Sequence, residues 1–360
     1  MNKSFINWWR NIDKVIFILA IILLSIGIVL SLTSTTEIQN FSSTYFIKRH
    51  LIFSLLSVGL IILISFQDVK LIRRLSLIGF FVSLGLILII LMFGYEINGS
   101  KRWLPILGFT IQPSEFLKPF FVVISAWFIT KGLEGKKFGF TIIIPLFILS
   151  SFLLILQPDF GMTVLFMAVF FSQLFVAGLS IIFVFMLVIF ILGVVILSYI
   201  YIENVRLRFN IFFDPSKGDT YQIEQSIKAF KSGGLTGKGL GQGTLKDKIP
   251  DAHTDFIFSV AGEELGYIFC SLLIFIFLII IIRSLLLILK KREPYSLILV
   301  AGLVSIFGLQ ALINIASSIG AAPTKGMTLP LISYGGSSMV SSSILIGILL
   351  SHTKGLKRKE

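Results

Sequence analysis

The chain has 360 residues, 56% of them hydrophobic, with a mean hydropathy of +0.97 and a formal net charge of +13. This composition excludes an ordinary soluble domain and predicts a protein with many membrane-spanning helices. The one cysteine, Cys270, lies inside an apolar run. An intramolecular disulfide is therefore impossible, and a thiolate metal site is not expected.

Apolar runs near the roughly 20 residues that a membrane helix needs predict an all-α polytopic membrane protein with about ten transmembrane helices. The first run is too long for a signal-peptide core and lacks a small-residue cleavage site, so we expect a retained span. We expect one integral membrane domain over 1–360. The predicted spans are 15–33, 47–66, 75–94, 113–130, 139–156, 160–177, 180–202, 255–282, 296–318 and 337–352.

Basic residues gather in every second loop between these spans. Such loops are expected in the cytoplasm, and an even number of spans then places both termini there as well. Because this placement explains the basic excess, no nucleic-acid partner is expected. The clusters are Lys3, Arg10 and Lys14; Lys70, Arg73 and Arg74; Lys131, Lys136 and Lys137; Arg283, Lys290, Lys291 and Arg292; and Lys354, Lys357, Arg358 and Lys359.

One large external loop, 203–254, is predicted between spans seven and eight. Residues 221–230 in it are expected to form a short amphipathic helix on the membrane surface. A glycine-rich stretch follows at 233–243 beside Lys238, without the strand-to-helix context of a nucleotide loop. Its backbone N–H groups could cradle a pyrophosphate, and a flexible connector is the alternative.

The stretch 249–266 (IPDAHTDFIFSVAGEELG) places several acidic groups directly before an apolar span. Counted along a helix from Asp255, a stripe of small and polar residues recurs every three or four positions. The stripe predicts either a buried packing seam or a reaction cavity faced by Asp255 at its outer end. Its members are Ser259, Gly262, Glu263 and Gly266.

Further polar motifs lie on the predicted external side. QPSE at 112–115 opens span four, with proline in the first helical turn. Glu115 and Lys118 are three residues apart on one helix face, which suits a structural ion pair or a substrate contact. A second Gln-Pro-acid triplet ends at Asp159.

Span nine carries a polar stripe of Gln310, Asn314, Ser317 and Ser318, which interhelical hydrogen bonding can explain. The loop 323–338 (PTKGMTLPLISYGGSS) then predicts irregular backbone near the interface. Such backbone is tolerated only where it lines protein or a water-filled cavity.

Five motifs together resemble the SEDS (shape, elongation, division and sporulation) family of polytopic glycosyltransferases, over nearly the whole chain from span two onward. They are NGSKRW with QPSEFLKP, QPDFG, SGGLTGKGLGQG, HTDFIFSVAGEELG and PTKGMTLPLISYGGSS. The last motif and the Ala-Gly-Glu-Glu run are more similar to division members than to elongation members. Leu235 departs from the family pattern, in which relatives often have an aromatic residue.

The resemblance implies polymerisation of lipid II, the cell-wall precursor, at the outer face of the bacterial cytoplasmic (inner) membrane, at the division septum. It also implies a class B penicillin-binding protein and other divisome membrane proteins as partners. Asp255 matches the essential aspartate of the family. Candidate substrate-binding residues are Arg102, Glu115, Lys118, Asp159, His253, Asn314, Lys325 and Ser333.

The chemistry requires a base for the attacking sugar hydroxyl and cations for the leaving pyrophosphate. Asp255 suits the first task, because a helix N-terminus favours its ionised form. Arg102, Lys118 and Lys325 suit the second. A divalent cation (Mg²⁺ or Mn²⁺) would serve the same end, held by one or two carboxylates and substrate phosphate without a fixed metal site. His253 is expected to be a structural hydrogen-bonding group.

Three alternatives remain open at this point. A flippase or transporter of the lipid-linked precursor would also carry ionisable residues inside a helical bundle. Its site is expected near the midplane with repeat symmetry, whereas the polar motifs here gather on the external half. The others are a non-catalytic scaffold and an elongation-type polymerase.

Overall fold

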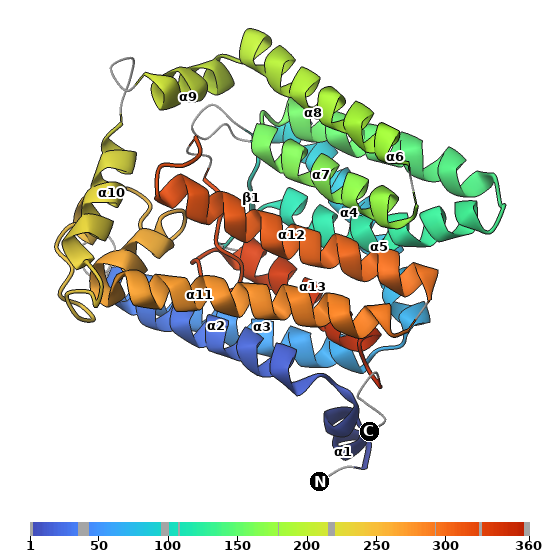
Figure 1. Cartoon of the computed structure of the whole chain (residues 1–360), viewed down its shortest axis with the longest axis horizontal. Coiled ribbons are helices and arrows are strands. Elements are labelled where there is room, and N and C mark those ends of the chain that lie inside the picture. Colours follow the sequence, from blue (N-terminus) through green and yellow to red (C-terminus); the bar gives the residue numbers. More distant parts are fainter. Residues whose placement is uncertain are drawn as a thin grey trace.

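The computed structural model describes residues 3–34, 43–94, 101–106, 109–178, 180–214, 220–291, 293–323 and 326–355. Long helices lie side by side and make up most of this structure (Figure 1). The helices are α1 (Lys3–Asn11), α2 (Lys14–Ser34), α3 (Ser43–Phe66), α4 (Val69–Phe93), α5 (Pro113–Leu133), α6 (Phe138–Leu156), α7 (Phe160–Val176), α8 (Ile181–Tyr201), α9 (Glu203–Phe213), α10 (Tyr221–Gly233), α11 (Ile257–Leu289), α12 (Pro294–Ser318) and α13 (Gly336–His352), with a short 3₁₀ helix η2 (Lys246–Lys248).

Each predicted span falls on a helix, from α2 to α8 and from α11 to α13. Seven of the helices in the described ranges are long and apolar enough to cross a membrane. Helices α7 and α13 are shorter, with 17 residues each. A bend of 99° separates the second half of α8 from α9, and this pair would make an eighth span. The structure therefore supports a multi-pass helical membrane protein with seven or eight candidate spans.

The predicted start of the eighth span is wrong. Residues 251–256 form turns, and α11 begins only at Ile257. Gly266 interrupts α11 with φ 79° and ψ 178°, so a short first segment precedes a long straight one. Only glycine adopts this backbone conformation without steric cost, and it creates the kink. Asp255 is therefore not on the helix that carries the polar stripe.

A two-stranded antiparallel hairpin precedes α5 and was not expected from the sequence. Strands β1 (Leu104–Ile106) and β2 (Phe109–Ile111) pair Leu104 with Ile111. The hairpin leads directly into Pro113 at the first turn of α5. It thereby fixes the entry of the chain into the bundle.

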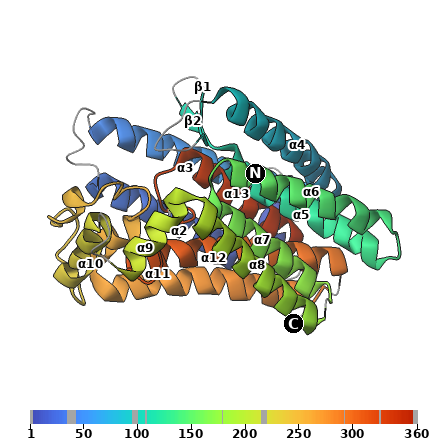
Figure 2. The ribbon, with the colours of Figure 1, turned by 90° about the horizontal axis from the view of Figure 1, so that it is seen from above.

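A helix at 221–230 is confirmed as α10, and its place on the membrane surface stays a prediction. Its buried residues include Ser226, Ala229 and Phe230, and they pack on α11. Protein, and not only lipid, therefore covers its buried side. Helices α9 and α10 lie together at one end of the bundle (Figure 1, Figure 2).

The chain ends meet at the other end of the bundle. The Gly355 N–H donates to the Asn11 carbonyl at 3.0 Å. The Ser351 hydroxyl donates to the Gln67 carbonyl at 2.8 Å, which brings the α3–α4 turn to the same place. The ring of His352 lies 5.8 Å from that of Tyr295, at the start of α12. Segments that carry the basic clusters thus gather at one end, as the positive-inside pattern requires.

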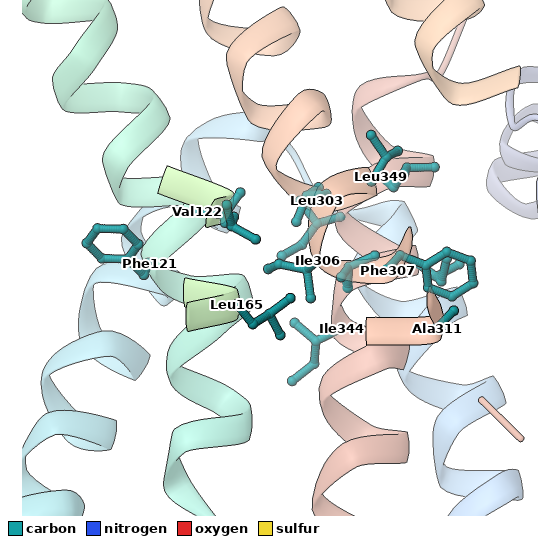
Figure 3. Packing of buried hydrophobic residues seen from close by; sticks show 14 of the residues in the cluster. Phe121, Val122, Leu165, Leu303, Ile306, Phe307, Ala311, Ile344 and Leu349 are labelled. Atoms are coloured by element: carbon teal, nitrogen blue, oxygen red, sulfur yellow. The ribbon is translucent and has the colours of Figure 1, made fainter. Parts of the chain in front are cut away.

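Apolar side chains fill the interior between α5, α7, α12 and α13 (Figure 3). Phe121 of α5 lies 4.4 Å from Phe166 of α7 between ring centroids, within the range of favourable aromatic packing. Ile306 and Phe307 of α12 are 4% and 1% exposed. A closed apolar layer therefore separates the two ends of the bundle.

A bidentate ion pair joins α11 to the residue before α2, at the end of the bundle that carries the chain ends. Arg283 of α11 donates from Nε and Nη2 to the Asp13 carboxylate, each at 2.7 Å. The Ile16 N–H donates to the same carboxylate at 3.0 Å. Burial raises the pKa of Asp13, but the hydrogen bonds from Arg283 and Ile16 and the Arg283 charge outweigh it and leave that pKa below its usual value.

We predict that Asp13→Asn lowers stability at pH 7 by about 1 kcal/mol, because water partly screens the pair. Arg283 is 39% exposed. Because the pKa of Asp13 is lower in the folded state, its ionised carboxylate stabilises the fold at pH values above its unfolded pKa of about 4. This contribution is lost as the pH falls through the folded-state pKa of Asp13. The difference between the two proteins should therefore vanish under acid conditions. Thermal unfolding in detergent from pH 7 to pH 3 measures it.

The control is Lys131→Gln, which removes a more exposed pair with Glu134 at the same end. It should leave the unfolding temperature unchanged. A gap between Asp13→Asn and wild type that does not narrow as the pH falls from 7 to 3 would contradict the assignment.

Candidate functional site

Asp255 lies in the turn that precedes α11, at the end of the bundle opposite the chain ends. Its N–H donates to the Asp251 carbonyl at 3.0 Å, and Asp251 has a positive φ of 56°. The Asp255 side chain is half-buried. The opposite end of α11 carries Arg283, which pairs with Asp13 beside the chain ends. Asp255 therefore lies at the end of the bundle that the sequence predicts to be external, which is called the outer end below.

A second irregular segment, 326–335, packs against this turn. The side-chain amide of Asn314 donates to the Asp255 carbonyl at 2.8 Å and to the Met327 carbonyl at 2.5 Å. The Tyr334 N–H donates to the His253 carbonyl at 2.9 Å. The Asn314 amide hydrogens are thus directed to backbone carbonyls, which assigns this residue a structural role. Irregular backbone in the bundle obtains its hydrogen bonds from α12, as membrane proteins require.

Arg102 and Asp159 bring the two Gln-Pro motifs together. The Arg102 guanidinium donates to the carbonyls of Gln157 (3.2 Å) and Pro158, and lies 3.7 Å from the Asp159 carboxylate. The Gln112 side chain donates to Asp159 at 3.4 Å. Asp159 is 3% exposed and Arg102 18% exposed in their side chains. Arg102 therefore keeps a solvent-accessible edge above a buried acid.

Arg208 of α9 links this group to Asp255. Desolvation lowers the pKa of Arg208, and the charge of Arg102 lowers it further, whereas the charges of Asp159 and Asp255 raise it. All three residues thus lie within electrostatic range of one guanidinium. The structure therefore gathers two carboxylates and two guanidinium groups, from four separate segments, at the outer end of the bundle.

Glu115 and Lys118 form the predicted ion pair on α5, at 2.9 Å. The Lys118 ammonium also donates to Gln310 of α12 at 2.7 Å, and its side chain is 2% exposed. Gln310 in turn donates to the Thr328 carbonyl at 3.1 Å. Through Gln310 the pair therefore supports the 326–335 segment. This is the role expected of a structural ion pair. A substrate contact by either residue stays a prediction.

The segment directly after the glycine-rich stretch binds an internal carboxylate, that of Glu263. The Glu263 carboxylate, 0% exposed, accepts hydrogen bonds from three successive backbone N–H groups at 2.9 to 3.2 Å. The donors are Thr244, Leu245 and Lys246. The Lys238 ammonium lies 3.3 Å from the same carboxylate. The backbone N–H groups of 244–246 thus bind Glu263, and a pyrophosphate contact by the glycine-rich stretch itself stays a prediction.

The small residues of the predicted stripe fit this packing. Ser259 lies 2.5 Å from the Ser226 hydroxyl of α10. A Cβ atom added at Gly262 would lie 2.2 Å from the Phe230 ring, and one at Gly237 would lie 2.2 Å from the Glu264 carbonyl. The stripe is therefore a packing seam, and a reaction cavity faced by Asp255, which precedes the helix, stays a prediction.

Glu264 forms a buried pair with Lys246. The two charged atoms lie 2.7 Å apart, and the side chains are 0% and 2% exposed. An ion pair of this kind is strongly destabilised when one partner is removed, because the other charge remains desolvated. This pair fixes the start of η2 to the first segment of α11.

The remaining candidates differ in their surroundings. The His253 ring lies among Phe46 and Tyr334, at 5.5 Å from each ring centroid. Burial lowers the pKa of His253, and the Asp251 charge opposes this, so that the neutral ring acts as a packing group. The Ser333 hydroxyl accepts the Leu329 N–H at 2.8 Å inside a turn. Lys325 lies outside the described residues.

Sequence reasoning missed Arg208, Gln112 and Gly326. Arg208 was only one of many basic residues in the long loop, and no local pattern set it apart. Gln112 is the first residue of the QPSE motif, but its pairing with Asp159 depends on contact between two distant turns. Gly326 is part of the PTKG motif, which was a usable signal.

A family model described as "Cell cycle protein" (FTSW_RODA_SPOVE) matches residues 13–357. This match covers nearly the whole chain. The chain belongs to the FtsW/RodA/SpoVE family. The SEDS resemblance carried by the sequence motifs is thereby confirmed.

Relatives of this family member resemble it along their whole length. A probable peptidoglycan glycosyltransferase FtsW of Caulobacter vibrioides is 37% identical over 352 residues, or 96% of this chain and 90% of the relative. The protein of the same name from Trichlorobacter lovleyi is 36% identical, over 96% of this chain and 94% of the relative.

Two solved structures share the fold. One is a chain from a peptidoglycan synthase complex that coordinates polymerization and crosslinking (TM-score 0.77, 24% identity, 95% of this chain and 97% of that one). The other is the rod shape determining protein RodA of Thermus thermophilus (TM-score 0.70, 25% identity, 96% of this chain and 97% of that one).

The described residues contain no group of three or more His, Cys, Asp or Glu side chains placed to hold a metal ion. Asp159 and Asp255, which both lie within electrostatic range of Arg208, supply two carboxylates at most. This donor set suits a hard cation that completes its coordination with phosphate oxygens and water.

We predict that Lys246→Met and Glu264→Gln each destabilise the protein, by about 3–5 kcal/mol if the remaining group stays charged and buried. The double variant should lose clearly less stability than the sum of the single variants, because no unpaired charge remains. Thermal or denaturant unfolding in detergent measures the cycle.

Lys228→Met supplies the matched control. It removes an ion pair with Glu224 in which both side chains are more than half exposed, and little change is expected. Additive losses in the Lys246 and Glu264 cycle would contradict the buried pairing.

Proposed function

We propose that this protein is a peptidoglycan glycosyltransferase that polymerises lipid II into glycan strands at the outer face of the cytoplasmic membrane. Relatives with 36–37% identity along nearly the whole chain carry the name peptidoglycan glycosyltransferase. The main structural support is the half-buried carboxylate of Asp255, which lies at the outer end of the bundle within electrostatic range of Arg208.

Asp255 is proposed as the general base. The acceptor sugar hydroxyl attacks the anomeric carbon of the donor, its proton passes to the Asp255 carboxylate, and the bond from that carbon to the pyrophosphate oxygen breaks. A base within hydrogen-bond reach contributes about 10²–10⁴-fold to such a step. The half-buried position keeps the carboxylate within reach of a substrate while limiting access of water.

Arg102 and Arg208 are proposed to stabilise the leaving pyrophosphate. Guanidinium groups bind phosphate oxygens in a bidentate manner and stay charged at any relevant pH. Arg102 is already oriented by two carbonyls and by Asp159. Fixed cations of this kind stabilise charge that develops in the transition state without reorganisation.

A divalent cation, Mg²⁺ or Mn²⁺, fits the same place. Asp159 or Asp255 would hold it together with substrate phosphate, and it would add positive charge at the leaving group. Lys325, Glu115 and Lys118 remain proposed substrate contacts, and Lys118 is more deeply buried than Glu115.

The division type is proposed over the elongation type. The relatives with 36–37% identity carry the name FtsW, whereas RodA of Thermus thermophilus is 25% identical. A septal location and partnership with a class B penicillin-binding protein and other divisome membrane proteins follow from this assignment. A flippase is less consistent with the apolar layer that closes the bundle interior (Figure 3).

We predict that Asp255→Asn abolishes polymer formation from lipid II while leaving the unfolding temperature within a few degrees of wild type, because the change removes the base and keeps the side-chain volume. Gel analysis of glycan strands made by the purified full chain measures this. Asp251→Asn is the matched control, since this exposed neighbour in the same turn has no proposed catalytic role.

Normal polymerisation by Asp255→Asn would remove the proposed base. Movement of lipid II across liposomes without any polymer from the wild type would favour a flippase instead.

The proposed topology has ten spans, both termini in the cytoplasm and 203–254 outside. We predict that an impermeant maleimide labels Lys231→Cys, but not Lys136→Cys, when added to intact spheroplasts in a Cys270→Ser background. Both lysines are exposed, and Cys270 is buried. Both variants should react after lysis. Labelling of Lys136→Cys in intact spheroplasts would overturn the orientation.

A further inference from the structure

Gly326 lies directly against the carboxylate of Asp255. A Cβ atom added at Gly326 would stand 2.8 Å from Oδ2 and 3.6 Å from Cγ of Asp255. Real Cβ atoms essentially never approach another atom within 3.0 Å, so the carboxylate occupies space that any other residue would fill. Gly326 also has a φ of 61°, in the left-handed region that side chains disfavour.

The Asn314 side chain holds the backbone of both segments that meet at this contact. Asn314 donates to the carbonyl of Asp255 and to that of Met327, the residue after Gly326. The segment that follows is held further by the Tyr334 N–H on the His253 carbonyl. Neither backbone can retreat without loss of these hydrogen bonds, so the side chain of Asp255 is the part able to move.

We propose that Gly326 is a positioning residue for Asp255: its missing side chain fixes the direction in which the carboxylate points. This inference rests on the proposed role of Asp255 as the base. A methyl group at 326 forces the short carboxylate side chain into another rotamer. Such a rotation moves the base away from the acceptor hydroxyl, and we expect it to change stability little, because the displaced Oδ2 is the far end of a flexible side chain and not backbone.

The contact lies at the open end of the site. Gly326 is exposed, and Asp255 is half-buried beneath it. The 326–335 segment therefore acts as a wall on one side of the carboxylate and leaves another side accessible. A misplacement of about 1 Å in a reacting group can cost about 10²-fold in rate, which sets the size of the expected effect.

The test compares two glycines of similar backbone conformation in the same region. Gly320 has a φ of 73°, and a Cβ atom there would meet only side-chain carbons of Ile227 and Ile223, at 3.0 Å and beyond. Gly320→Ala therefore reproduces the backbone strain of Gly326→Ala without touching Asp255. Gly326→Asn is measured beside them, because asparagine tolerates positive φ yet still carries a Cβ atom.

Polymerisation of lipid II by each full-length purified variant gives kcat and KM, and thermal unfolding gives stability. We expect Gly326→Ala and Gly326→Asn to lower kcat about 100-fold relative to Gly320→Ala, with KM unchanged. The unfolding temperatures of Gly326→Ala and Gly320→Ala should agree. If Gly326→Ala does not fold, Gly326→Asn decides the question.

Equal kcat values for the Gly326 variants and Gly320→Ala would overturn the inference while Asp255→Asn remains inactive. Activity of Asp255→Asn itself would instead remove the proposed base, so the two failures are distinguishable. A loss confined to KM would show that Gly326 acts on substrate binding, and a loss matched by an equal loss of stability would show that it acts on the fold. Either result would overturn the inference.

Discussion

The side-chain amide of Asn314 holds together the two irregular segments on which the candidate site depends. It donates to the Asp255 carbonyl and to the Met327 carbonyl, across an interface between residues far apart in the chain. Non-helical backbone in a membrane protein is stable only where protein or water satisfies its polar groups. Because α12 presents this amide from a rigid, buried helix, the Asp255 turn and the 326–335 segment keep one relative position.

The charged residues of the outer end divide into two groups. Glu263, Glu264 and Lys246 are fully buried, and their bonds fix the glycine-rich stretch to the first segment of α11. Asp255 and Arg102 keep solvent-accessible surface, and together with buried Asp159 they lie around Arg208. The first group builds the support, and the second group is available for a phosphate-bearing substrate. The sequence alone does not distinguish these two groups, because each combines acidic side chains with basic ones.

Apolar side chains pack on one side of Lys118, and the polar groups of the site lie on the other side. Phe121, Leu165 and Ile306 pack in the interior (Figure 3). Lys118 lies next to them and begins a polar network with Gln310. A buried ammonium is costly in hydrocarbon, so it stays where Glu115 and Gln310 compensate it. The site is therefore one-sided: polar groups face the end that carries α9 and α10, and packed side chains close the other direction.

The sequence by itself determined the helical positions, the family and the residue types that the chemistry requires, because apolar run length and turn motifs are local properties. It also predicted the Glu115–Lys118 pair, whose members lie one helical turn apart. Only the tertiary structure decided that Glu263 accepts the backbone N–H groups of 244–246 and that Asp255 precedes the helix and packs on Gly326. It also decided that Arg208 lies within electrostatic range of Arg102, Asp159 and Asp255. These contacts connect segments separated by many residues, and their geometry depends on how the helices pack, which no local pattern encodes.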